Sequence, residues 1–81
     1  MAVIVTRFIG PTHFNGPRIK AYNDNGKSII VPWRDDLDID DNHLMAADAL
    51  MQKLELPEKA WVSGWHRGEK FFISYSPPKL D

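Results

Sequence analysis

Residues 35–54 of this chain, DDLDIDDNHLMAADALMQKL, place an acidic run directly before a segment with helical periodicity. From Asn42 to Leu54, apolar side chains recur at spacings of three and four residues, as on one side of an amphipathic helix. They are Leu44, Ala47, Leu50, Met51 and Leu54. Asp40 or Asp41 suits the N-cap, because a carboxylate accepts hydrogen bonds from the free N–H groups of a first helical turn. The sequence therefore predicts one helix over 42–54, ended by Leu56-Pro57.

Segments rich in β-branched and aromatic residues lie on both sides of this helix and predict strands. Three precede the helix, at 2–9, 18–22 and 27–33, and two follow it, at 61–65 and 70–75. Asn23 to Gly26 and His66 to Glu69 are short and suited to tight turns, so each predicts a β-hairpin. The order β-β-β-α-β-β predicts an α+β fold of two layers, an antiparallel sheet with one helix on one face.

Such a sheet leaves one face uncovered, and the register of the last hairpin determines which side chains share a face. A turn centred on Arg67-Gly68 pairs Trp65 with Lys70, Ser63 with Phe72 and Trp61 with Ser74. We assign the alternate set, Val62, Gly64, Phe71, Ile73 and Tyr75, to the helix. Trp61, Trp65 and Phe72 are then expected on the uncovered face, although a one-residue slip of register would bury all three. Arg18, Lys20 and Tyr22 alternate with Ile19 and Ala21, and we expect them on the uncovered face too.

The 81 residues, with a net charge of −1 and no cysteine, predict one small domain over 1–76 and a tail at 77–81. A chain of this length has little room for a deep substrate cleft. The absence of cysteine fits a reducing compartment, and the first residues lack the pattern of a signal peptide. We therefore expect a cytoplasmic protein, in a bacterial host cell, with no membrane association.

Chemical motifs point away from catalysis. His13, His43 and His66 share no ligand spacing, so neither a metal nor another cofactor is expected. The alternation Asp36-x-Asp38-x-Asp40 is similar to a calcium loop, but the sixth position is Asp41 where glycine is required and the twelfth is Ala47 where glutamate is required. No nucleophile accompanies a paired base, and no glycine loop is built for phosphate. We expect a protein that is not an enzyme.

The acidic run permits two interpretations. Its carboxylates are Asp35, Asp36, Asp38, Asp40 and Asp41. They could face lysines and arginines of a protein partner, with Trp61, Trp65 and Phe72 as apolar anchors, because aromatic residues dominate contact energetics. The same run could instead be a solvated loop that caps the helix and favours its dipole.

Several short matches support a resemblance to a known group of proteins. They are Gly10-Pro11-Thr12, Gly16, Arg18 to Ala21, Gly26 to Ile29, Val31-Pro32, Asn42-His43, Ala46-Ala47 and Trp61-Val62, spread over residues 6–73. Together they resemble small uncharacterised proteins encoded by bacteriophages and proteobacterial genomes. The chain departs from that pattern at His13-Phe14-Asn15 and at Glu55-Leu56-Pro57.

The resemblance implies a phage setting, and the order of elements is similar to that of some anti-CRISPR proteins. It implies a non-enzymatic inhibitor that occludes a site on a host defence complex, such as a CRISPR surveillance complex. Two alternatives stay open. One is a nucleic-acid-binding accessory protein that uses Arg18, Lys20 and Tyr22. The other is a structural, self-assembling phage component with a homodimer interface on the uncovered sheet.

Overall fold

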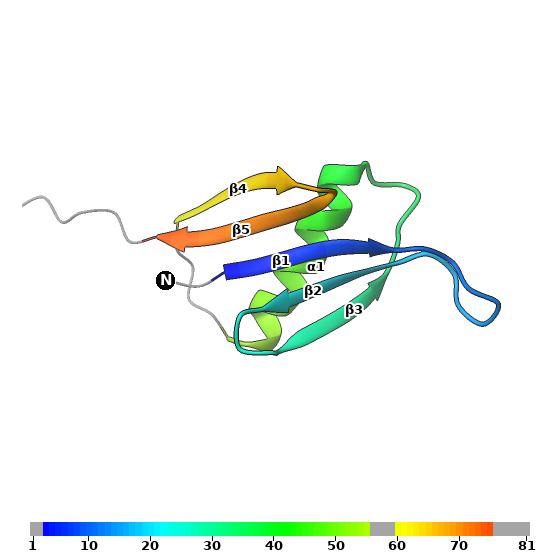
Figure 1. Cartoon of the computed structure of the whole chain (residues 1–81), viewed down its shortest axis with the longest axis horizontal. Coiled ribbons are helices and arrows are strands. Elements are labelled where there is room, and N and C mark those ends of the chain that lie inside the picture. Colours follow the sequence, from blue (N-terminus) through cyan, green and yellow to red (C-terminus); the bar gives the residue numbers. More distant parts are fainter. Residues whose placement is uncertain (1–2, 56–59, 76–81) are drawn as a thin grey trace, which may run out of the picture.

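A computed structural model of the chain describes residues 3–55 and 60–75. The elements follow the predicted order: β1 (Val3–Ile9), β2 (Arg18–Asn23), β3 (Ser28–Pro32), α1 (Ile39–Lys53), β4 (Ala60–His66) and β5 (Glu69–Tyr75). Figure 1 shows the strands as one layer with α1 lying behind them. The predicted helix stop at Leu56-Pro57 and the predicted tail at 77–81 lie outside the described residues.

The sheet is antiparallel throughout, with strand order β3-β2-β1-β5-β4. The predicted hairpins form β2–β3 and β4–β5, and the first strand pairs between them. Both hairpin turns use left-handed backbone, with φ of 82° at Gly26, 51° at Arg67 and 80° at Gly68. Positive φ at two successive residues matches the twist of the strands in a two-residue hairpin turn. The predicted α+β fold is therefore confirmed.

The hydrophobic core lies between α1 and one face of the sheet. Ile4, Ile19 and Ala21 come from the strands, and Ala46, Ala47 and Leu50 come from the helix. The helix touches the sheet through alanines, which are small enough to let its backbone come close. We call the other sheet surface, opposite α1, the open face.

The helix begins earlier than its sequence pattern predicted. Ile39 is its first residue and Asp38 is its N-cap, with the Asp38 Oδ1 accepting from the Asp41 backbone N–H at 2.7 Å. The predicted caps, Asp40 and Asp41, therefore lie in the first turn. Leu44 was expected in the core but is exposed, and His43 takes the buried position beside it.

The register of the last hairpin is confirmed, but the assignment of its two faces was wrong. Trp65 pairs with Lys70, Ser63 with Phe72 and Trp61 with Ser74, as predicted. This set faces α1: Phe72 belongs to the core and Trp61 packs against it. The alternate set, which includes Val62, Gly64, Phe71 and Ile73, lies on the open face.

The physical reason is the way the helix covers the sheet. Small residues occupy its line of closest approach, so the indoles fit along its flanks and need no place in the centre of the core. Trp61 is half-buried there, and Trp65 is 47% exposed. The small core thus encloses neither indole, and α1 shields each of them only in part.

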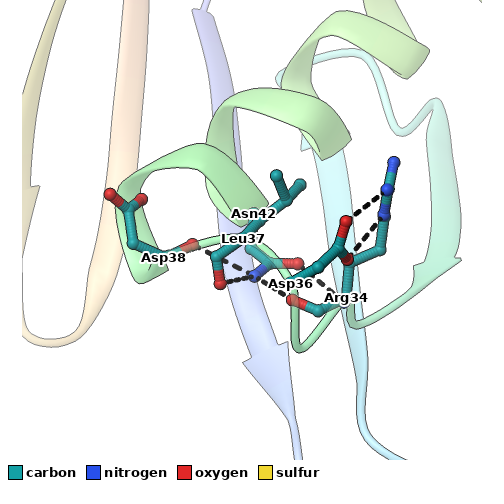
Figure 2. A network of polar contacts seen from close by, with 5 residues as sticks. All are labelled: Arg34, Asp36, Leu37, Asp38 and Asn42. Atoms are coloured by element: carbon teal, nitrogen blue, oxygen red, sulfur yellow. Dashed lines mark hydrogen bonds and ion pairs between the residues drawn. The ribbon is translucent and has the colours of Figure 1, made fainter.

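Asn42 fixes the chain where the acidic run enters the helix (Figure 2). Its side chain is fully buried. Oδ1 accepts from the Arg34 N–H at 2.9 Å, while Nδ2 donates to the carbonyls of Arg34, Leu37 and Asp38 at 2.9, 3.2 and 3.0 Å. One amide side chain thus satisfies backbone groups over the whole turn before α1, which explains why a polar residue is buried at this point.

We expect Asn42→Ala to destabilise the fold by about 2 to 3 kcal/mol, because it leaves several buried backbone groups without a partner. Urea denaturation measures the difference. Gln52→Ala is the matched control: its amide bonds Asp48 on the exposed side of the same helix, and its cost should stay within about 0.5 kcal/mol. Equal costs for the two variants would contradict the assignment.

Candidate functional site

The acidic run is largely engaged in its own segment. Arg34 Nε donates to Asp36 Oδ1 at 3.1 Å, and this ion pair lowers the pKa of the Asp36 carboxyl. Asp38 is the N-cap, and Asp40 Oδ1 lies 3.1 Å from Lys70 Nζ on β5. Asp35 and Asp41 are exposed like the others. Most of these carboxylates therefore form contacts within the protein, and their binding to a partner stays a prediction.

The three predicted aromatic anchors do not form a surface on the open face. Phe72 is only 4% exposed, and Trp61 is half-buried against the core. Trp65 lies on the same side as α1, where its ring centroid is 4.6 Å from that of His43 and its neighbour Lys70 lies 5.4 Å above it. These residues hold the helix to the sheet.

His43 stands at the centre of this contact. Its ring is nearly buried, lies edge-on to Trp33 and Trp65, and places Nδ1 2.7 Å from Thr6 Oγ1 on β1. Burial lowers the pKa of His43, the nearby positive charge of Lys70 lowers it further, and Asp40 opposes both effects. The folded protein therefore favours the neutral form of the His43 imidazole over the protonated form.

The open face carries the other predicted group, Arg18, Lys20 and Tyr22, as expected from their alternation with buried Ile19 and Ala21. The neighbouring strand adds Arg7, which the register places directly opposite Lys20, just as Ile9 lies opposite Arg18. Three cations from two adjacent strands therefore gather at one end of this face.

The carboxylate of Glu69 on β5 is already engaged on this face. Tyr22 Oη on β2 donates to Glu69 Oε2 on β5 at 2.6 Å, across the intervening strand β1. That hydrogen bond and the nearby negative charge, together with burial, raise the pKa of Tyr22, and Arg7 opposes the rise. Within residues 3–55 and 60–75, neither Arg7, Arg18 nor Lys20 forms an ion pair.

The far half of the open face is apolar and aromatic. Val5 lies opposite Tyr22 on one side and Phe71 on the other, and Phe71 in turn lies opposite Gly64. The His66 ring lies 6.3 Å from that of Phe71. Because Gly64 has no side chain and a Cβ there would meet nothing within 4 Å, the position beside Phe71 on β4 is open, and we call this open position the notch.

Sequence reasoning did not include Arg7, Phe71 and Gly64 in this site. Arg7 lies in a strand whose alternation is obscured by apolar residues on both faces, Val3 and Val5 on one and Ile4 on the other. Phe71 and Gly64 were assigned to the helix side. In the paired strand β2, buried Ile19 alternates with polar Lys20. This alternation was the signal that could have placed Arg7 on the open face, because Arg7 lies opposite Lys20.

Among the described residues, no three histidine, aspartate or glutamate side chains converge as ligands for a metal ion. In the same part of the chain, no helix has the length and apolar character needed to cross a membrane. Comparison with protein families, curated proteins and solved structures finds no match to this chain. The resemblance to phage-encoded proteins therefore stays a prediction.

We expect the protein to lose stability as the pH falls below about 6.5, the ordinary pKa of histidine. The unfolded chain binds a proton on His43 at that pH, while the folded protein resists protonation until the pH is lower. Between the two values the unfolded state binds more protons, so acid favours unfolding.

Thermal unfolding at about pH 7.5 and about pH 5.5 measures this effect. His43→Gln keeps a polar group for Thr6 but cannot titrate, so its melting temperature should change less between the two pH values than that of the wild type. His66→Gln removes an exposed imidazole and serves as the control. A pH dependence that survives in His43→Gln would contradict the assignment to His43.

Proposed function

We propose that the protein binds nucleic acid on the open face of its sheet. The observation that carries this proposal is the pair Arg7 and Lys20, two cations that lie directly opposite each other on adjacent strands with no ion-pair partner among the described residues. The protein would then be a binding protein, and its ligand would carry several negative charges in a row.

Like charges opposite each other destabilise a sheet, whereas opposite charges there stabilise it. A hydrophobic or oppositely charged pair would serve the fold better at this position. Phosphate groups of a bound strand would lie between the two cations and convert their repulsion into attraction, with release of counterions from the nucleic acid.

Arg18 adds an independent observation on the same strand. Its Nε atom is buried and has no hydrogen-bond partner. The buried Nε is covered by the protein and cannot itself reach a ligand. Arg18 therefore contributes through the positive charge that its guanidinium adds to the face carrying Arg7 and Lys20, a group that phosphates bind well.

The distribution of charge over the molecule fits this orientation. The net charge is only −1, but the aspartates lie at the start of α1, and Arg7, Arg18 and Lys20 lie on the opposite side of the sheet. A polyanion approaching the protein would be repelled by the helix layer and attracted to the open face.

We expect the double variant Arg7→Gln/Lys20→Gln to bind a labelled oligonucleotide at least about tenfold more weakly than the wild type. The slope of log affinity against log salt concentration should be smaller by about 2 in this variant, because each lost phosphate contact lowers it by about 1. Fluorescence anisotropy at several salt concentrations measures both quantities. Lys27→Gln, which removes an exposed cation from the β2–β3 turn, is the matched control.

Urea denaturation distinguishes lost contacts from lost structure. Removing the repulsion between Arg7 and Lys20 should leave the stability of the double variant equal to that of the wild type or above it. Wild-type protein without affinity for oligonucleotides, or a double variant with an unchanged salt slope, would refute the proposal.

A second candidate function uses the opposite side of the molecule. On the outer side of α1, Ile39 is 61% exposed and Leu44 is 51% exposed. Leu44 lines a shallow hollow with Met45 and the carboxylates of Asp41 and Asp48. Exposed aliphatic side chains ringed by carboxylates fit a basic protein partner, so an inhibitor of the anti-CRISPR type would use this surface, without the predicted aromatic anchors.

Interferometry with a purified CRISPR surveillance complex tests this candidate. We expect binding that weakens with salt and that falls about tenfold or more in Leu44→Ala and in Asp41→Asn/Asp48→Asn. Asp24→Asn, in the exposed β2–β3 turn, is the charge control. No binding, or equal binding by every variant, would exclude this target.

A further inference from the structure

Building on the proposed function, we infer that the ligand is a single strand and that the notch over Gly64 receives an unpaired base against Phe71. The inference rests on the shape of the open face beside the cations. It depends on nucleic acid binding at all, and its test separates the two claims.

The notch is formed by one lateral row of the sheet. The register aligns Tyr22, Val5, Phe71 and Gly64 across β2, β1, β5 and β4. Val5 is buried beneath its neighbours, while Phe71 is half-buried. Gly64 is exposed, and the space where its side chain would stand is empty. An aromatic ring thus borders a gap that a planar group can enter from solvent.

Aliphatic side chains and the His66 ring border this gap, and the Glu69 carboxylate, which accepts from Tyr22, lies opposite His66. Val62, on the same strand and face as Gly64, is 52% exposed, and it lies opposite half-buried Ile73. His66 follows on the other side, with its ring inclined by 70° to that of Phe71. Exposed aromatic and aliphatic surface next to cations suits a base attached to a phosphate backbone.

The cations lie near the notch on the same face. Arg7 and Lys20 occupy the row next to Tyr22 and Phe71, about 7 Å further along the strands, since two residues of a strand span that length. Arg7 is also two strands away from Gly64, about 10 Å across the sheet. A single strand crossing this face can place phosphates on the cations and turn a base into the notch. A duplex cannot, because its bases are paired and stacked inside the helix.

A second copy of the chain is a poorer occupant of this face. Two open faces packed about a two-fold axis would bring Arg7, Arg18 and Lys20 close to the same cations of the partner copy, which disfavours the contact. The charge on the face thus selects an anionic ligand, and the notch selects one with free aromatic rings.

The test compares a labelled single strand of about ten nucleotides, within the site sizes of small single-strand binders, with the duplex of the same sequence. Gly64→Val fills the notch with a side chain that suits a strand and changes no charge. Ser63→Val makes the same kind of change one residue earlier, on the face toward α1, and is the control. Phe71→Leu removes the ring and keeps the site apolar.

We expect the wild type to prefer the single strand by about tenfold or more, a range set by the contribution of one stacked base. Gly64→Val and Phe71→Leu should lose that preference, with melting temperature and salt slope unchanged because no phosphate contact is removed. Ser63→Val should retain it.

Equal affinity for strand and duplex, unaffected by Gly64→Val, would overturn this inference and leave the proposed function intact. Failure of the wild type to bind any oligonucleotide would overturn both. Light scattering on the free protein completes the test: a dimer that Gly64→Val or Arg7→Gln disrupts would show that the open face is a contact between copies and would likewise overturn both.

Discussion

The contact between the alanine face of α1 and the strands is the constraint on which the rest of the structure depends. Ala46 and Ala47 bring the helix close to Ile4 and Ile19, so the core forms on one side of the sheet only. The same close approach leaves flanks on which Trp61 and Trp65 lie. Every property of the open face follows from this one-sided cover, because a second helix would have buried the cations that lie there.

Polar contacts hold the start of the helix in place, and several carboxylates of the acidic run take part in them. Asn42 binds the backbone of the preceding turn, Asp38 caps the helix, and Asp40 reaches Lys70 on the last strand. The carboxylates that look like a binding element in the sequence are thus largely occupied by the fold. Arg7, Arg18 and Lys20 on the open face form no ion pair among the described residues, and this difference favours the open face as the functional surface.

Much of the architecture could be predicted from local patterns. The order of elements and the pairing of Trp65 with Lys70 depend on periodicity and turn chemistry, which act over a few residues. The site was predicted only in part. Arg18, Lys20 and Tyr22 lie on the open face as expected, because alternation with Ile19 and Ala21 gives them one side of a strand. Arg7 joins them only through pairing between β1 and β2.

The sequence by itself determined the strands, the helix, the hairpin register and the residues that share a face, because each depends on neighbours along the chain. It could not determine which face the helix covers, since both faces of β4 and β5 carry large apolar side chains. Only the tertiary structure decided that question, when the fit between small helix residues and the sheet buried Phe72 and left half-buried Phe71 on the open face. The physical reason is that periodicity divides a strand into two faces, whereas packing in three dimensions selects the one to bury.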